Sequence, residues 1–165
     1  MRSRWWTAGA FVASFLGTAT ANTAVSASEY RTSLQEVYGR YQAVFAMRDA
    51  CGTAFPAMKP ANEKAFAGWQ SRHHKLHDEL EQRFALMIRA YSKDEKDYAK
   101  NFGKYQGVLL RQRDEVKQAL LAENRGELET RCKGFPAFLA GRESDLETEF
   151  ANEWLVLRQW QLPAK

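Results

Sequence analysis

The chain has 165 residues, of which 45% are apolar, and its 24 Lys and Arg residues against 20 Asp and Glu residues give a net charge of +4. This length and composition suit one packed domain and argue against a disordered or fibrous protein. The small charge imbalance argues against a nucleic-acid-binding protein, and nothing in it requires a membrane surface.

The first residues have the pattern of a secretory signal peptide. Arg2 and Arg4 precede an apolar run over 5–16, and two A-x-A-like cleavage sites follow, at Ala19–Ala21 and Val25–Ala27. We favour cleavage after Ala27, because polar helical sequence begins immediately afterwards. The alternative is an uncleaved anchor helix, but the run is shorter than the 20 or so apolar residues that span a bilayer.

Cleavage at this position predicts a signal peptide over 1–27 and a single helical domain over 28–165. The remaining 138 residues carry 22 basic and 20 acidic side chains, a net charge of +2. The chain has no cysteine near the cleavage site, which argues against a lipoprotein. It also has no second apolar run, so no transmembrane segment is predicted. We therefore expect a soluble protein that is periplasmic or secreted.

Apolar residues recur every three or four positions through the rest of the chain, which predicts helices. The first helix covers about 30–51 and is broken by Gly52, Pro56 and Pro60. The second covers about 62–91, with Asn62 as its candidate N-cap.

The third helix is predicted to begin at the capping box Ser92–Glu95 and to continue to about 120. A kink or end is expected near Asn124–Gly126, followed by another turn or two. Pro136 is expected in the first turn of a fourth helix that continues to Pro163. Trp69 and Trp154 follow the apolar register of their helices, so we expect both in the core.

A short phrase occurs twice where this periodicity breaks: Cys51-Gly-Thr-Ala-Phe-Pro-Ala57 and Cys132-Lys-Gly-Phe-Pro-Ala137. Internal duplication and two independent hinges of similar geometry both explain it. No strand or hairpin signal is present. The fold class expected is all-α, an antiparallel up-down-up-down four-helix bundle of two helical hairpins.

In that topology both hinges lie at the same end of the bundle, so the sequence predicts one disulfide between Cys51 and Cys132. Two cysteines in an exported chain most simply form one disulfide. A cross-link that encloses about 80 residues stabilises a fold by roughly 4 kcal/mol on the chain-entropy model.

One cluster has the chemistry of a metal site. His73 and His77 are four residues apart on a helix and Glu81 continues the same ridge. A structural zinc ion normally has four ligands, and the H-E-x-x-H pattern of metalloproteases is missing. We favour the alternative, in which His73 packs at the edge of the core and His77 is solvated, and we expect no metal or other cofactor.

No catalytic set is found in the sequence. The chain has no G-x-S-x-G motif and no C-x-x-C-H haem attachment site, and the Glu-x-x-His pairs of di-iron bundles are absent. We therefore expect that the protein is not an enzyme.

Three residues are candidates for a surface contact. Gly103 and Gly107 are four residues apart inside a predicted helix, where glycine is unfavourable. We favour a close helix crossing there over a surface depression where a partner docks. Trp160 lies near the end of the last helix and is expected to be an exposed apolar contact.

The charge pattern has one marked feature: Lys93, Lys96, Lys100 and Lys104 form a ridge. A solvated face is the ordinary interpretation, and a ligand-recruiting patch is the alternative.

Together these patterns favour a non-enzymatic binding, adaptor or chaperone-like module whose partner is another envelope protein. The alternative is a metal- or small-ligand-binding helical bundle that uses His73 and His77.

Overall fold

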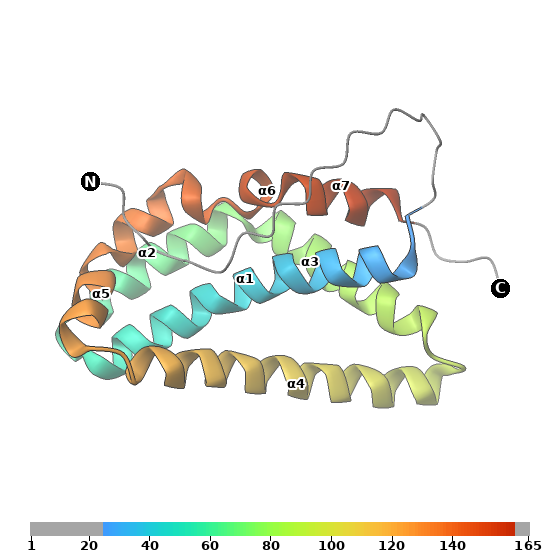
Figure 1. The fold of residues 1–165 in the computed structure, drawn as a ribbon, viewed down its shortest axis with the longest axis horizontal. Helices are drawn as coiled ribbons and strands as arrows, with labels where there is room; N and C mark the ends of the chain where they lie inside the picture. The colour runs from blue at the N-terminus through green and yellow to red at the C-terminus, as the bar shows by residue number, and fades with distance from the viewer. Residues whose placement is uncertain (1–24, 161–165) are drawn as a thin grey trace.

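The computed structural model describes residues 25–160, and within that range it is helical, with no strand (Figure 1). The all-α prediction is confirmed. The helices are α1 (Ala27–Ala54), α2 (Lys59–Arg72), α3 (His74–Ala90), α4 (Glu95–Leu121), α5 (Arg125–Ala140), α6 (Leu146–Glu149) and α7 (Ala151–Gln159), with the short 3-10 helices η1 (Pro56–Met58) and η2 (Arg142–Ser144). None of the helices in 25–160 has the length and apolar character that a membrane span requires.

Most of the predicted signal peptide lies outside the described residues, but its favoured cleavage site falls beside a helix cap. The Ser26 side chain accepts the Glu29 amide hydrogen at 3.2 Å, and the Ser26 amide donates to the Glu29 carboxylate at 2.8 Å. This capping box begins α1. Cleavage after Ala27 would remove it, whereas cleavage after Ala21 would retain it.

The second predicted helix is divided in the structure. It begins at Lys59, so Asn62 is not its N-cap but a buried residue within α2. The helix breaks at His73, and α3 continues to Ala90. Proline cannot be placed deep in a helix without losing a hydrogen bond, and Pro60 stands in the first turn of α2, where its missing N–H costs nothing.

The predicted capping box of the third helix is wrong. Asp94 is the N-cap of α4, and its side chain accepts the Asp97 amide hydrogen at 2.8 Å. The Ser92 hydroxyl instead donates to the Ile88 carbonyl at 2.8 Å and accepts a hydrogen bond from Asn101. Ser92 therefore closes α3 rather than opening α4.

The fourth predicted helix begins earlier and ends sooner than expected. Asn124 caps α5, Pro136 lies inside that helix instead of in a first turn, and the chain leaves it at Gly141. It then turns through η2 and α6 into α7.

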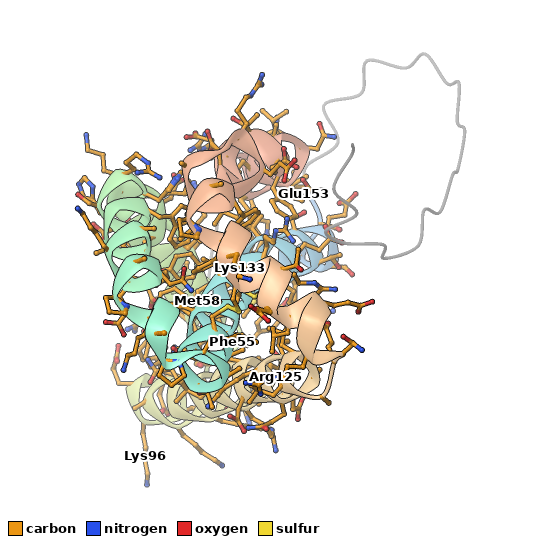
Figure 2. All side chains as sticks on the ribbon, turned by 90° about the vertical axis from the view of Figure 1, so that its left-hand side faces the viewer. Phe55, Met58, Lys96, Arg125, Lys133 and Glu153 are labelled. Atoms are coloured by element: carbon orange, nitrogen blue, oxygen red, sulfur yellow. A yellow bond between two sulfur atoms is a disulfide. The ribbon has the colours of Figure 1, made fainter. Side chains whose placement is uncertain are left out.

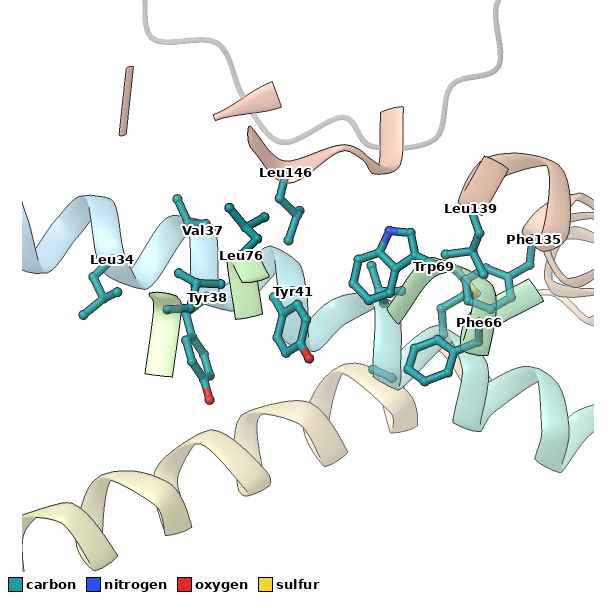
Figure 3. Packing of buried hydrophobic residues seen from close by; sticks show 14 of the residues in the cluster. Leu34, Val37, Tyr38, Tyr41, Phe66, Trp69, Leu76, Phe135, Leu139 and Leu146 are labelled. Atoms are coloured by element: carbon teal, nitrogen blue, oxygen red, sulfur yellow. The ribbon is translucent and has the colours of Figure 1, made fainter. Parts of the chain in front are cut away.

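The core contains both tryptophans that the sequence assigns to it, and Figure 3 shows Trp69 among the buried side chains. Trp69 and Trp154 are fully buried, and their indole N–H groups donate to the carbonyls of Ser144 and Leu146, at 3.0 and 3.2 Å. A buried indole N–H needs a partner. These two bonds hold the segment between α5 and α7 against the core.

The predicted disulfide is confirmed. Cys51 near the end of α1 is bonded to Cys132 in α5, with their Cα atoms 5.4 Å apart and both side chains fully buried. Figure 2 looks onto this end of the molecule, where Phe55, Met58 and Arg125 surround the junction. The bond fixes the end of α1 to the last third of the chain.

Replacement of both cysteines, Cys51→Ala with Cys132→Ala, should lower the free energy of unfolding by about 4 kcal/mol, because the unfolded chain regains the entropy of an 81-residue loop. Urea titration measures this loss. The wild-type protein, unfolded without reductant, should show no thiol to alkylation. Two alkylated thiols per chain would contradict the cross-link.

Candidate functional site

A groove of about 680 Å³ lies between α1, α3 and α4. Phe84 and Met87 of α3 form its floor, and Tyr105, Leu109 and Val116 of α4 form one wall. The opposite wall belongs to α1: Leu34, Gln35, Tyr38, Gly39, Gln42 and Ala43. Most of this surface is apolar.

The groove exists because the side of α1 that faces α4 carries residues that cannot pack closely against it. Gln35, Gly39 and Gln42 are spaced by four and three residues, so they lie along one stripe of the helix. A Cβ placed at Gly39 would meet no atom within 4 Å. Two polar amides and a residue without a side chain cannot fill the space between the helices, and the groove stays open there.

As a consequence of the open groove, α4 is poorly buried. Although it is 27 residues long and runs beside α1, only Leu120 among its residues is buried. Leu109 and Val116 are partly buried, and Tyr105 is 38% exposed. An apolar helix side that is left incompletely covered is typical of a ligand site or an interface.

Contacts at both ends hold α4 against the remainder of the fold. Toward the disulfide end, Arg113 forms an ion pair with Asp49, and its guanidinium lies 4.9 Å from the centre of the Phe45 ring. Toward the other end, the Phe102 ring packs edge-on against Phe84, with the ring centres 6.0 Å apart. The middle of α4 therefore bridges the groove and does not close it.

Two charged side chains line the groove: Arg113, which is paired with Asp49, and Glu115, which has no ion-pair partner among residues 25–160. Burial alone would raise the pKa of Asp49, but the hydrogen bonds and charges of Arg113 and Arg48 outweigh it and hold that pKa below its ordinary value. Asp49 thus stays ionised and neutralises Arg113. The Tyr38 hydroxyl donates to Glu81 at 2.8 Å, and burial, reinforced by this bond, raises the pKa of Tyr38 far above neutral pH. Figure 3 shows Tyr38 pointing from α1 toward the side where α4 runs.

The histidines lie at a second, smaller hollow of about 330 Å³, at the break between α2 and α3. His77 stacks on Tyr41 with ring centres 5.0 Å apart, and its Nε2 is 3.5 Å from Glu81 Oε1. His73 lies against Trp69, with ring centres 5.3 Å apart. Each ring is thus packed against an aromatic neighbour, so His77 is not simply solvated, as the sequence suggested, but is stacked and partly exposed.

No group of three or more His, Cys, Asp or Glu side chains in residues 25–160 is arranged to hold a metal ion. Glu81, the proposed third ligand, accepts the Tyr38 hydroxyl. The geometry of His73, His77 and Glu81 therefore favours packing and hydrogen bonding over metal coordination.

The close crossing that the sequence predicts at Gly103 and Gly107 is wrong. A Cβ at either position would meet no atom within 4 Å, and both glycines are exposed. Trp160 is not a free apolar end either, because it stacks on Tyr30 with ring centres 4.1 Å apart and packs against the core. None of these three residues lines the groove.

The groove residues were missed by sequence analysis, although one signal was present. A stripe of Gln, Gly and Gln next to the apolar stripe of the same helix marks a side that cannot pack tightly. The glycine at position 39 was readable as unusual in a helix. Which helix faces that stripe could not be read from the chain.

Chelation should leave the stability of the protein unchanged, because the His73, His77 and Glu81 side chains already have protein partners. Thermal unfolding with and without EDTA measures this. Stoichiometric zinc or copper in protein purified without added metal would contradict it, as would a chelator-induced fall in the melting temperature.

His73 should make stability depend on pH. Burial lowers its pKa, opposed in part by Asp145 and Glu147 and assisted by Arg72. The unfolded chain, with a His pKa of about 6.5, binds the proton more readily, so the free energy of unfolding should fall as the pH drops below about 6.5. In urea titrations at pH 7 and pH 5, His73→Gln should reduce this loss. The exposed His74, changed to Gln, is the control, and equal losses in both variants would contradict the assignment.

Comparison with known proteins assigns no family to this chain. No family model, no curated protein and no solved structure matches it. The proposals below therefore depend on the geometry of the groove and of α4.

Proposed function

We propose that this chain is a non-enzymatic binding protein that takes an elongated, mainly apolar small molecule into the groove between α1, α3 and α4. The observation that carries the proposal is a groove of about 680 Å³ with a mostly apolar lining. Small-molecule sites ordinarily measure about 300–1,000 Å³ and combine apolar walls with a few polar groups.

The polar groups in the groove argue against an anionic ligand, because Glu115 adds a negative charge to the lining. Gln35, Gln42 and Gln112 supply neutral amides, which both donate and accept hydrogen bonds. Arg113 is already paired with Asp49, so it is poorly placed to neutralise an anionic group. A long apolar body with one hydrogen-bonding group, such as a hydroxyl or carbonyl, fits this lining.

Binding fits the lining better than catalysis. The titratable side chains among the described lining residues are Tyr38, Tyr105, Arg113 and Glu115. Of these, Tyr38 is engaged by Glu81 and Arg113 by Asp49. A nucleophile with an adjacent base is the usual requirement for covalent chemistry. The disulfide supports an exported protein, because such bonds persist in oxidising compartments.

We also infer that the fold is an up-down-up-down bundle of four antiparallel segments. The first is α1, the second is α2 together with α3, the third is α4, and the fourth comprises α5 to α7. The directions of the ribbons in Figure 1 and the pairing of Cys51 with Cys132 support that order. The thiol measurement described above bears on it, since free cysteines would remove the argument that both hinges share one end.

Gly39→Leu should weaken binding of N-phenyl-1-naphthylamine, an uncharged fluorescent apolar probe, by about tenfold or more, because the new side chain enters the groove. Gly103→Leu is the matched control: it is also a helical glycine with open space, but it lies outside the groove. Both changes should raise the free energy of unfolding by up to about 1 kcal/mol. Fluorescence titration and urea titration measure the two effects.

Equal probe binding by the wild type and both variants would refute the groove as the site. So would a wild type that does not bind the probe but forms dimers that Gly39→Leu abolishes, because the occupant of the groove would then be a second copy. Light scattering at the concentrations of the titration separates these outcomes.

A further inference from the structure

The outer side of α4 carries an uninterrupted basic face, defined here as Lys96, Lys100, Lys104 and Arg111. Their spacings of four, four and seven residues place them on one side of the helix, and all four are exposed. Figure 1 shows α4 along one edge of the molecule, and in Figure 2 Lys96 points away from it. At the helical rise of 1.5 Å per residue, the face is roughly 22 Å long.

None of these four cations forms an ion pair within the described fold. Among residues 25–160, no carboxylate lies within ion-pair distance of Lys96, Lys100, Lys104 or Arg111, whereas Arg83 and Arg131 are paired with Glu79 and Glu123. Asp114 and Glu115 follow Arg111 by three and four residues but are not in ion-pair contact with it, and the two acids nearest the lysines are engaged elsewhere. Glu95 pairs with Arg89, and Asp97 accepts the Lys93 amide at 3.0 Å. The positive charge of the face is therefore not neutralised within the fold.

The helix surface between the cations lacks protruding side chains. Gly103 lies between Lys100 and Lys104, and Gly107 lies between Lys104 and Arg111. Both leave the helix backbone bare, with open space where a Cβ would stand. Leu110 follows and is 64% exposed. A bare backbone flanked by long flexible cations fits an extended, flat surface better than a protruding one.

We propose that the basic face of α4 docks onto the surface of a bilayer rich in anionic lipids. Lysine is a point charge on a flexible stem, suited to a layer of mobile headgroups, whereas recognition of one fixed carboxylate or phosphate favours bidentate arginine. Three of the four cations are lysines. The length of the face and the open space at Gly103 and Gly107 match a membrane surface.

This inference goes beyond the proposed function, because docking does not require an occupied groove. The two are spatially related, since α4 forms one wall of the groove and carries the basic face on its opposite side. A protein docked in this way holds the groove close to the headgroups, where apolar molecules with one polar group reside.

The test is co-sedimentation of the exported protein with vesicles of equal parts phosphatidylglycerol and phosphatidylcholine, compared with phosphatidylcholine alone. The variant replaces three lysines, Lys96→Gln, Lys100→Gln and Lys104→Gln. The control, Lys64→Gln, Lys75→Gln and Lys133→Gln, changes the net charge equally at exposed sites outside α4. Glutamine is a good helix former, and circular dichroism checks that both variants fold.

A basic residue near an anionic surface strengthens partitioning by roughly fivefold. The α4 variant should therefore partition about 100-fold more weakly than the wild type, and the control variant less than about fivefold more weakly. Raising the salt concentration should weaken wild-type binding, because it screens the headgroups. Equal losses in both variants would overturn the proposal, since net charge alone would then govern binding. No preference of the wild type for anionic vesicles would overturn it as well, and would direct attention to an acidic protein partner.

Discussion

The structure depends on the way α1 divides its surface among its neighbours. Tyr30, Leu34 and Val37 are fully buried, and α1 contacts every other helix of the described range. An adjacent stripe of the same helix carries Gln35, Gly39 and Gln42. The first surface assembles the core and the second cannot close against α4, so a single helix determines both the stability of the fold and the position of its groove.

The open groove is compatible with a stable fold because α4 is held near its ends. The Arg113–Asp49 pair acts toward the disulfide end, and the contact of Phe102 with Phe84 acts toward the other. Neither contact fills the space between them. A partly exposed ion pair contributes little to stability by itself, so the packing of Leu120 and of the aromatic rings has the larger share.

The opposite side of the molecule is fixed by different means. The buried disulfide joins α1 to α5, and beyond α5 the chain turns sharply at Gly141. Backbone carbonyls of the segment after this turn accept hydrogen bonds from the indole N–H groups of Trp69 and Trp154. The segment between α5 and α7 is thereby attached to two of the largest core residues. The result is a cross-linked half formed by α2, α5 and the turn, beside a half in which α4 lies over an open groove.

The sequence by itself determined the helical class, the disulfide and the two core tryptophans. These features follow from local periodicity and from the small number of cysteines, which need no knowledge of neighbours. The sequence predicted the ends of the helices less accurately. Ser92 and Asp94 are both good caps, and the choice of Asp94 depends on Ser92 being used by Ile88 and Asn101.

Only the tertiary structure decided which surfaces meet. Gly39, Gly103 and Gly107 look alike in the sequence, yet one lines the groove between helices and two lie on the outer side of α4. Trp160 looked like a free end and is instead stacked on Tyr30. Helical periodicity gives the side of a helix on which a residue lies, but the side that faces another helix is set by long-range packing, which no local pattern encodes.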